Sequence, residues 1–286
     1  MKSAIKYILA LSVGLAGGPC AFAGPILGSA QSFAILGTST IANSGPTTIN
    51  GDIGLYPGTA FAGTDSVIVT GTVHLADTVA RQALLDADAA YQNLAALAFT
   101  SDLSGQDLGG RTLTPGVYFY ASSAQLTGTL TLDARNDPNA LFVFQVGSTL
   151  TTAVASSVNV INGGAGTGVF FDVGTSATLG TSSLFVGNIL ARQSITLNTS
   201  AQILCGRVAA LGAVVTIDTN VISNDCGELG LGRNDFGSAG FSGVAAALTP
   251  APVTVPVPEP ATLPLVGGAL LVVALGRRRK PVIAAA

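Results

Sequence analysis

Apolar and polar residues alternate over short stretches through most of this 286-residue chain. Such alternation indicates a β-strand with one buried face, because successive side chains of a strand point to opposite sides. The clearest example is a short phrase that returns four times: Thr, an aliphatic residue, any residue, Thr. The four copies occupy residues 149–152, 178–181, 196–199 and 216–219. Recurrence at similar but uneven intervals predicts stacked coils of chain.

The repeated phrase also predicts rows of threonine on one outer surface of the coils. If the aliphatic residue of each copy points inward, its first residue and its third point outward. Aligning the copies gives two outward rows, one of first residues and one of third residues: Thr149, Thr178, Thr196 and Thr216, then Thr151, Gly180, Asn198 and Asp218. Neighbouring strands lie about 4.7–4.9 Å apart, so the rows would form a flat array of methyl and hydroxyl groups. Threonine is also common in strands because it is β-branched, and the pattern alone leaves both interpretations open.

Shorter strands and turns are predicted before and between these copies. Thr48 with Asn50, and Thr70 with Thr72, could extend the outward rows toward the N-terminus. Residues 141–146 form a continuous apolar run, which predicts a strand that is buried on both sides or faces a helix.

One segment has a helical pattern instead. In residues 77–97, Ala, Leu, Gln and Asp replace Gly, Thr and Val, and apolar residues recur on one helical face. Asp77 is placed to cap the N-terminus of this helix. We expect the helix to lie along the side of the coils and bury its apolar stripe there, with Asp86 and Asp88 solvated.

Composition narrows the possible partners. Charged residues make up only 9% of the chain, against about 25% in an average globular domain. All three lysines lie near the termini, and residues 24–258 carry six Arg against fourteen Asp or Glu, a net charge of −8. Phosphate contacts need Lys and Arg, so this body is not expected to bind nucleic acid.

The N-terminus has the pattern of a secretory signal peptide over residues 1–23. Lys2 and Lys6 precede an apolar stretch, and Ala21-Phe22-Ala23 forms an A-x-A cleavage site. A membrane anchor is the alternative, although the apolar stretch is short for a span. Cys20 follows Gly18-Pro19, which is not the small-residue context of a lipoprotein signal, and is expected to leave with the signal peptide.

The C-terminus has the pattern of a second targeting signal. Residues 227–256 read as a flexible Gly-, Ser-, Ala- and Pro-rich linker. The motif Pro258-Glu259-Pro260 follows, then a predicted membrane helix over residues 261–276 and the basic cluster that ends at Lys280, with a tail over 281–286. Residues 257–280 resemble a PEP-CTERM sorting signal, which implies export in a Gram-negative bacterium and cleavage by a membrane exosortase. A simple tail anchor is the alternative.

Two cysteines remain in the exported body, Cys205 and Cys226. An even number of cysteines outside the cytoplasm favours a disulfide, which would fasten the last coil to the segment after it. Two free thiols are the alternative.

Residues that could carry catalysis or hold a metal are scarce. The single histidine, His74, has no recognisable partner for a catalytic triad, and the body is nearly free of Glu. Loops with several carboxylates can bind calcium, but their spacing here matches no known calcium loop: Asp102, Asp107, Asp133 and Asp137. The sequence therefore predicts no enzyme, no metal site and no cofactor.

Residues 24–226 resemble the bacterial and microbial ice-binding proteins. Three segments carry the resemblance. The first is Leu-Gly-Ser-Ala-Gln-Ser-Phe-Ala-Ile-Leu-Gly at 27–37, and the second is Asn-Gly-Asp-Ile-Gly at 50–54, before the Ala-rich helix. The third is Val-Phe-Phe-Asp-Val-Gly-Thr-Ser-Ala-Thr-Leu-Gly at 169–180, continued by Gly-Asn-Ile-Leu-Ala at 187–191 and Ser-Ile-Thr-Leu-Asn at 194–198.

The resemblance implies a mainly β fold: an irregular right-handed β-solenoid (β-helix) with one long α-helix packed alongside. It implies a secreted or cell-surface protein that adsorbs to ice through one flat face and inhibits ice growth or recrystallisation. The residues expected on that face are Thr149, Thr151, Thr178, Thr196, Asn198 and Thr216, whereas Gly180 and Asp218 depart from the pattern. Two alternatives remain: a structural or adhesive protein of the extracellular polysaccharide matrix, and a polysaccharide lyase or hydrolase, which lacks paired acid and base residues.

Overall fold

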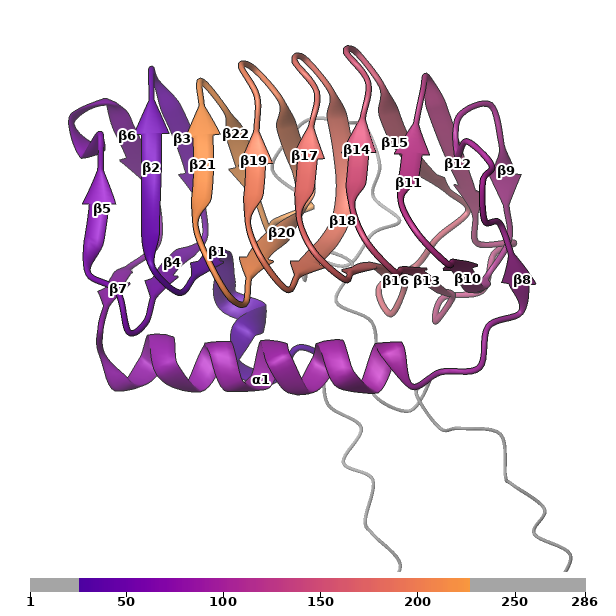
Figure 1. The fold of residues 1–286 in the computed structure, drawn as a ribbon, viewed down its shortest axis with the longest axis horizontal. Coiled ribbons are helices and arrows are strands. Elements are labelled where there is room, and N and C mark those ends of the chain that lie inside the picture. Colours follow the sequence, from indigo (N-terminus) through magenta and orange to yellow (C-terminus); the bar gives the residue numbers. More distant parts are fainter. Residues whose placement is uncertain (1–25, 227–286) are drawn as a thin grey trace, which may run out of the picture. The chain divides into compact units, whose positions relative to one another are not determined.

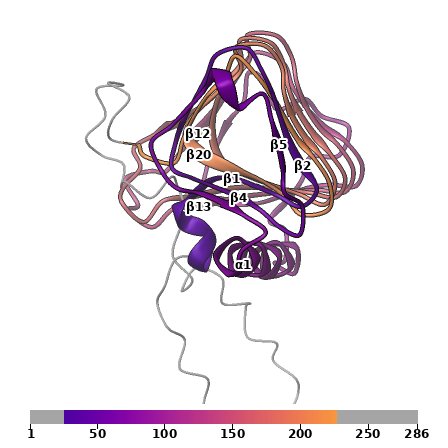
Figure 2. The ribbon, with the colours of Figure 1, turned by 90° about the vertical axis from the view of Figure 1, so that its left-hand side faces the viewer.

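The computed structural model describes residues 26–226, which form two sheets of parallel strands, one long α-helix and two short 3-10 helices, Gly28–Ser32 and Thr64–Ser66 (Figure 1). Viewed along the stack, these residues wind in successive turns around a three-sided interior, and the helix lies against one side (Figure 2). The expectation of a mainly β chain with one helix alongside is therefore confirmed.

The smaller sheet forms one side of the stack. Its seven strands lie in this order: β11 (Ala124–Leu126), β14 (Leu150–Thr152), β17 (Ala177–Leu179), β19 (Ile195–Leu197), β21 (Val215–Asp218), β2 (Thr40–Ser44) and β5 (Ala60–Ala62). Their burial alternates, as in β17, where Ala177 and Leu179 are buried and Thr178 is partly exposed. The side chains of alternate residues therefore face the interior and the solvent.

The larger sheet covers the other two sides. Its strands against the helix are β7 (Val73–Leu75), β4 (Asp52–Leu55), β1 (Phe33–Gly37), β20 (Gln202–Ala210), β18 (Leu184–Ala191), β16 (Gly168–Val173), β13 (Leu141–Val146), β10 (Gly116–Tyr120) and β8 (Ser101–Asp102). The third side contains β6 (Val67–Val69), β3 (Thr47–Asn50), β22 (Val221–Ser223), β15 (Ser157–Ile161), β12 (Thr129–Asp133) and β9 (Thr112–Leu113), together with the first residues of β20 and β18. Both long strands pass from one side to the other at a glycine. At Gly206 a Cβ atom would lie 1.9 Å from the carbonyl oxygen of Gly187.

The order of the coils differs from the order of the sequence. The chain runs outward from β1 to β7 at one end of the stack, and α1 (Thr78–Ala95) then carries it along the whole side to β8 at the other end (Figure 1). From there the coils return until β20, β21 and β22 pair with β1, β2 and β3. The first and last described coils are therefore neighbours, joined by contacts between residues far apart in the sequence.

Branched and aromatic side chains fill the interior. Phe144 stacks between Tyr118 and Phe171, at centroid distances of 5.3 and 4.5 Å. β13, the continuous apolar run, contacts both neighbouring strands and α1, as its pattern predicted. Inward-facing side chains at the same position of successive coils therefore stack on one another and form one continuous core.

The helix buries a stripe of small residues against the sheet. Asp77 caps its N-terminus by accepting a hydrogen bond from the backbone N–H of Ala80, as predicted. The buried positions are Ala80, Ala83, Ala87, Ala90 and Leu94, so alanine allows the helix to lie close to the strands. At the other end, the Gln145 side chain donates hydrogen bonds to the carbonyl oxygens of Leu94 and Leu97.

Two polar residues of α1 differ in part from expectation. Asp86 accepts hydrogen bonds from the backbone and the hydroxyl group of Ser29, and Asp88 forms an ion pair with Arg192. Arg192 also lies 3.8 Å from the ring centroid of Tyr91. The expectation of solvated carboxylates is met in part: both are partly exposed, but the N-terminal segment and the loop after β18 pack beside the helix and supply each with a protein partner.

A buried carboxyl group lies under the same helix. Asp172 on β16 is 3% exposed and lines a shallow cavity of about 200 Å³ with Tyr91, Gln145 and Gly174. Its Oδ1 atom has no hydrogen-bond partner among the described residues. Burial raises the pKa of Asp172 to about 8, although the charge of Arg192 opposes the rise.

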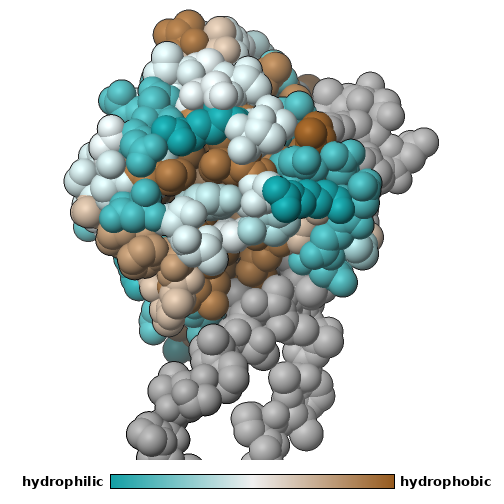
Figure 3. Space-filling model, turned by 90° about the vertical axis from the view of Figure 1, so that its right-hand side faces the viewer, coloured by the Kyte–Doolittle hydropathy of each residue, from teal (hydrophilic) through white to brown (hydrophobic). Residues whose placement is uncertain are grey.

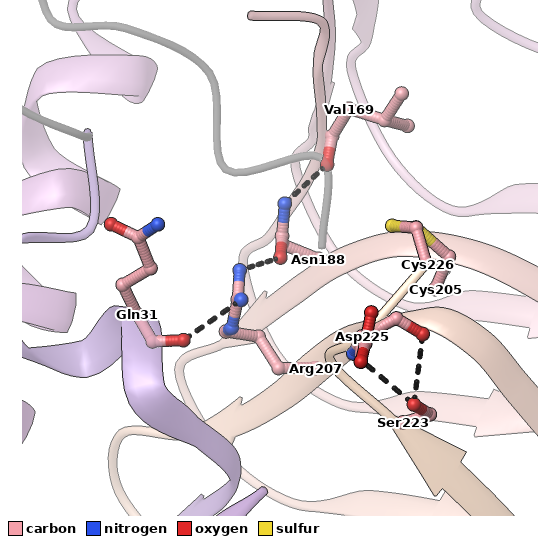
Figure 4. Close-up of a disulfide and its surroundings, with 8 residues drawn as sticks. All are labelled: Gln31, Val169, Asn188, Cys205, Arg207, Ser223, Asp225 and Cys226. Carbon is pink, nitrogen blue, oxygen red and sulfur yellow. Dashed lines mark hydrogen bonds between the residues drawn. A yellow bond between two sulfur atoms is a disulfide. The ribbon is translucent and has the colours of Figure 1, made fainter. Parts of the chain in front are cut away.

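The end of the described chain is fastened to the stack. Cys205 on β20 and Cys226 form a disulfide bond, with their Cα atoms 4.8 Å apart (Figure 4). Beside it, the buried Arg207 donates hydrogen bonds to the carbonyl oxygens of Phe33 and Gln31, and to the side chain of Asn188. Arg207 thereby ties the N-terminal segment to the returning coils.

Several expectations fall outside the described residues. These are the signal peptide of residues 1–23, the linker of 227–256, the sorting motif Pro258-Glu259-Pro260 and the membrane helix of 261–276. Between residues 26 and 226, no helix has both the length and the apolar character needed to cross a membrane.

Candidate functional site

The outer surface of the seven-stranded sheet carries one straight row of side chains. Each strand contributes one outward-facing residue to this row. In most strands, the residues directly before and after it have buried side chains. The strand register joins the row residues as direct neighbours, in the order Gln125, Thr151, Thr178, Thr196, Thr216, Ala42 and Ala62. Four consecutive coils therefore present a threonine at the same height, and we call these seven residues the central row.

The register corrects one part of the predicted alignment. Thr151 lies beside Thr178, whereas the repeated phrase had placed Thr149 there. Leu150 pairs with Ala177, so the first copy of the phrase is shifted by two residues against the other three. The inward-facing residues set the register, because their side chains must share the core. Ala177 fills the same inward position as Leu150. An alignment that matches only threonines therefore places this coil two residues out of register.

Two further rows flank the central row. Thr149 belongs to the first, beside Ser123, Ser176 and Ser194, and its hydroxyl group donates a hydrogen bond of 2.8 Å to the Ser123 hydroxyl. Asn198 belongs to the second, two residues beyond Thr196. All six predicted residues thus lie on this one surface, distributed over three rows rather than two.

The surface carries many hydroxyl groups and little charge. Among residues 26–226, the hydroxyl groups of Thr151, Thr178, Thr196 and Thr216 make no hydrogen bond to another protein group, so they are available to solvent. The second flanking row contains one carboxylate, that of Asp218. It accepts hydrogen bonds from the hydroxyl groups of Thr199 and Thr219. The surface therefore presents threonine methyl and hydroxyl groups to solvent.

The extension of the rows toward the N-terminus was assigned to the wrong strands. Thr48 and Asn50 lie on β3 in the larger sheet, and Thr70 follows β6 in the same sheet. Ala42 and Ala62 continue the central row instead, and Gln125 begins it. Gln125 lies in an apolar–x–apolar triplet, Ala124-Gln125-Leu126, and that signal would have found it, whereas Ala42 and Ala62 are followed by Asn43 and Gly63 and have no such signal.

The scaffold fixes the backbone beneath this surface. In most strands the row residue is flanked by side chains of the continuous core, such as Ile195 and Leu197 around Thr196. Ladder hydrogen bonds fix neighbouring strands at the regular spacing of a sheet. Little conformational entropy is therefore lost when this surface binds a partner of matching shape.

The single histidine, His74, is part of the helix cap. The His74 ring nitrogen Nδ1 lies 2.6 Å from the Asp77 carboxylate. The pKa of Asp77 is lowered, chiefly by the hydrogen bond from the Ala80 backbone and next by His74. Both residues thus serve the N-terminus of α1.

The four loop aspartates stabilise turns. Asp102, Asp107, Asp133 and Asp137 each accept a hydrogen bond from the backbone N–H group two residues further along the chain. Among residues 26–226, no three His, Cys, Asp or Glu side chains come together in a way that could hold a metal ion.

Sequence comparison places the chain beside ice-binding proteins. A family model described as "Ice-binding-like" matches residues 35–223. An "Ice-binding protein" of Nostoc sp. (strain HG1) is 55% identical over 201 residues, covering 70% of this chain and 74% of that protein. An "Ice-binding protein" of Flavobacterium frigoris (strain PS1) is 30% identical and covers 69% of this chain and 75% of that protein.

Solved structures give the same result. The crystal structure of an ice-binding protein from the Antarctic ascomycete Antarctomyces psychrotrophicus superposes with a TM-score of 0.66 at 40% identity, covering 70% of this chain and 98% of that one. An ice-binding protein from an Antarctic biological consortium gives a TM-score of 0.67 at 37% identity, covering 77% and 96%.

Proposed function

Because this chain belongs to the ice-binding-like family, we propose that it binds ice through the outer surface of the seven-stranded sheet and so inhibits ice growth or recrystallisation. The in-register row Thr151, Thr178, Thr196 and Thr216 carries the proposal. It is a flat, nearly uncharged array on one of the two sides of the stack that α1 does not cover (Figure 2).

The array would act by ordering water. Methyl groups restrict the orientations of neighbouring water molecules, and hydroxyl groups anchor them by hydrogen bonds. Threonine supplies both groups at each position, with strands about 4.7–4.9 Å apart. Since the backbone is already fixed, the ordered layer would match a crystal surface without further folding of the protein.

We interpret the winding of the chain as an irregular right-handed β-solenoid. Parallel strands in one sheet joined by a crossover are right-handed in about 98% of cases, which supports this handedness. In that fold every coil adds one member to the central row, so the row lengthens with the number of coils.

We further propose that the protein acts outside the cell. The signal-peptide pattern of residues 1–23 and the sorting motif Pro258-Glu259-Pro260 support export, transient anchoring in the inner membrane and recognition by an exosortase. The mature protein would be secreted or held at the surface of a Gram-negative bacterium.

The second candidate function is a structural or adhesive role in the polysaccharide matrix. The resemblance to a PEP-CTERM signal favours it, because proteins with this signal are associated with bacteria that produce exopolysaccharide. The exported protein would then bind the cell's own polysaccharide and have no effect on ice.

A single substitution tests the ice-binding surface. Thr196→Arg places a large charge at the centre of the row and should reduce ice recrystallisation inhibition while leaving circular dichroism unchanged. Thr131→Arg is the matched control, since Thr131 is also a partly exposed strand threonine but lies on β12, on another side of the stack. Equal activity of both variants would move the site away from this sheet.

A further inference from the structure

Both ends of the described stack leave strands unpaired. At one end β5, β6 and β7 each pair on one side only, with β2, β3 and β4. At the other end β8 and β9 pair on one side only, with β10 and β12, and Asp107 forms the last bridge beyond β11. Each end therefore presents one strand edge or bridge from each of the three sides of the stack.

The end formed by β5, β6 and β7 also leaves core positions uncovered. Val73 and Leu75 continue the interior rows that Ile53 and Leu55 occupy one coil inward, yet they are 41% and 39% exposed, while Ile53 and Leu55 are fully buried. On β6 the inward-facing Val67 and Val69 are only partly buried against the core. Stacked-coil proteins normally cover a terminal coil with a polar cap, and the described residues supply none here.

The opposite end presents apolar side chains as well. In Figure 3, which faces this end, hydrophobic residues gather at the centre of the surface between polar rims. Phe99 is 52% exposed and stacks on Phe119 at a centroid distance of 5.0 Å. Leu113 on β9 is partly buried against the core.

From these features we infer that the two ends bind each other between copies of the chain, so that the stack of one molecule continues into the next. The strand pairing within one copy predicts the register between two copies. On the helix side, one row of paired residues runs across the strands from Asp102 through Phe119 to His74, and the neighbouring row runs from Ser101 to Val73. Stacking two copies would therefore place β7 of one beside β8 of the other, with Val73 opposite Ser101 and His74 opposite Asp102.

A second copy satisfies the chemistry of both ends at once. All strand pairs in both sheets are parallel, so the edges of the two ends run in the same direction and can form new ladder hydrogen bonds. The contact would cover Val73 and Leu75 with the end that carries Leu113. It would also bring Ala62 beside Asp107, the bridge partner of Gln125 at the start of the central row, and so join the two seven-stranded sheets.

Such a contact is head-to-tail, because two different surfaces of the chain meet. Each surface can therefore be blocked separately by its own substitution. Sedimentation of the purified full-length chain should show a weight-average mass that rises with concentration. Leu75→Lys blocks one end and Leu113→Lys blocks the other, and each variant alone should remain a monomer. Mixed in equal amounts, the two variants should form complexes of two copies and no larger species, because one intact end of each kind remains.

The controls separate this association from misfolding and from general stickiness. Leu184→Lys removes an equally exposed leucine from the side of the stack, at 43% exposure, and should associate like the parent. Circular dichroism and thermal melting report whether each variant is folded, and Val73→Lys, on the same strand and the same face, replaces Leu75→Lys if the latter is not. A parent that stays monomeric at every concentration would overturn the inference, as would a mixture of folded variants that does not form the two-copy complex.

Discussion

The buried carboxyl group of Asp172 gives the protein a pH dependence that can be worked out from its position. The pKa of Asp172 is raised to about 8 in the folded protein by burial, against 3.8 in an exposed chain. Between these values the folded state holds a proton that the unfolded state has released. Stability therefore falls as pH rises from about 4 to about 8, and levels off above that.

The size of the effect follows from the same two values. Each tenfold change in proton affinity is worth about 1.4 kcal/mol, so the rise from 3.8 to about 8 corresponds to about 6 kcal/mol. Movement of Arg192 toward the ionised carboxylate would offset part of this loss of stability. We therefore expect the free energy of unfolding to fall by about 2–5 kcal/mol over this pH range. Five aspartates whose pKa values are lowered titrate below this window and do not contribute to it: Asp77, Asp86, Asp102, Asp107 and Asp133.

Urea unfolding at a series of pH values measures this loss directly. The parent should become less stable from pH 4.5 to pH 8.5. Asp172→Asn should abolish most of the slope, because its amide does not titrate, while Asp65→Asn, an exposed control, should leave the slope unchanged. A parent and an Asp172→Asn variant with the same slope would refute the assignment.

Three further predictions concern single groups. Tyr120→Phe should raise the free energy of unfolding by about 1 kcal/mol in urea titration, because the buried Tyr120 hydroxyl has no partner among the described residues; a loss of stability would show that the hydroxyl is bonded. Replacing Cys205 and Cys226 with Ser should lower the free energy of unfolding by about 3 kcal/mol, because the disulfide closes a separation of 21 residues; no change would mean that the bond is absent in solution. Asp218→Thr should increase ice recrystallisation inhibition, since a carboxylate keeps its own hydration shell; equal activity would place Asp218 outside the binding surface.

The fold was largely predictable because the coil pattern is local. Alternation identified the strands, and the change to helical periodicity found α1 and its Asp77 cap. The order of the coils could not be read in this way. That β21 pairs with β2, and β20 with β1, depends on α1 carrying the chain from one end of the stack to the other, a contact between distant segments that leaves no local pattern.

The sequence predicted that the six candidate residues share one surface, but not their register. The threonine phrase led to strands of a single sheet, yet it aligned Thr149 with Thr178 because it matched the exposed residues. The buried neighbours Leu150 and Ala177 decide the pairing, since their side chains share the core. Partners such as Ser29 for Asp86 were equally invisible, because they come from a segment 57 residues away.

The most direct test of the account is the ice activity of the purified protein with and without its central row. Ice recrystallisation inhibition and thermal hysteresis would be measured for the parent and for a triple substitution of Thr178, Thr196 and Thr216 with Arg, with circular dichroism as the folding control. We predict activity in the parent and its loss in the folded triple variant. An inactive but folded parent would contradict ice binding and favour the matrix role, and a fully active triple variant would contradict the assignment of the surface.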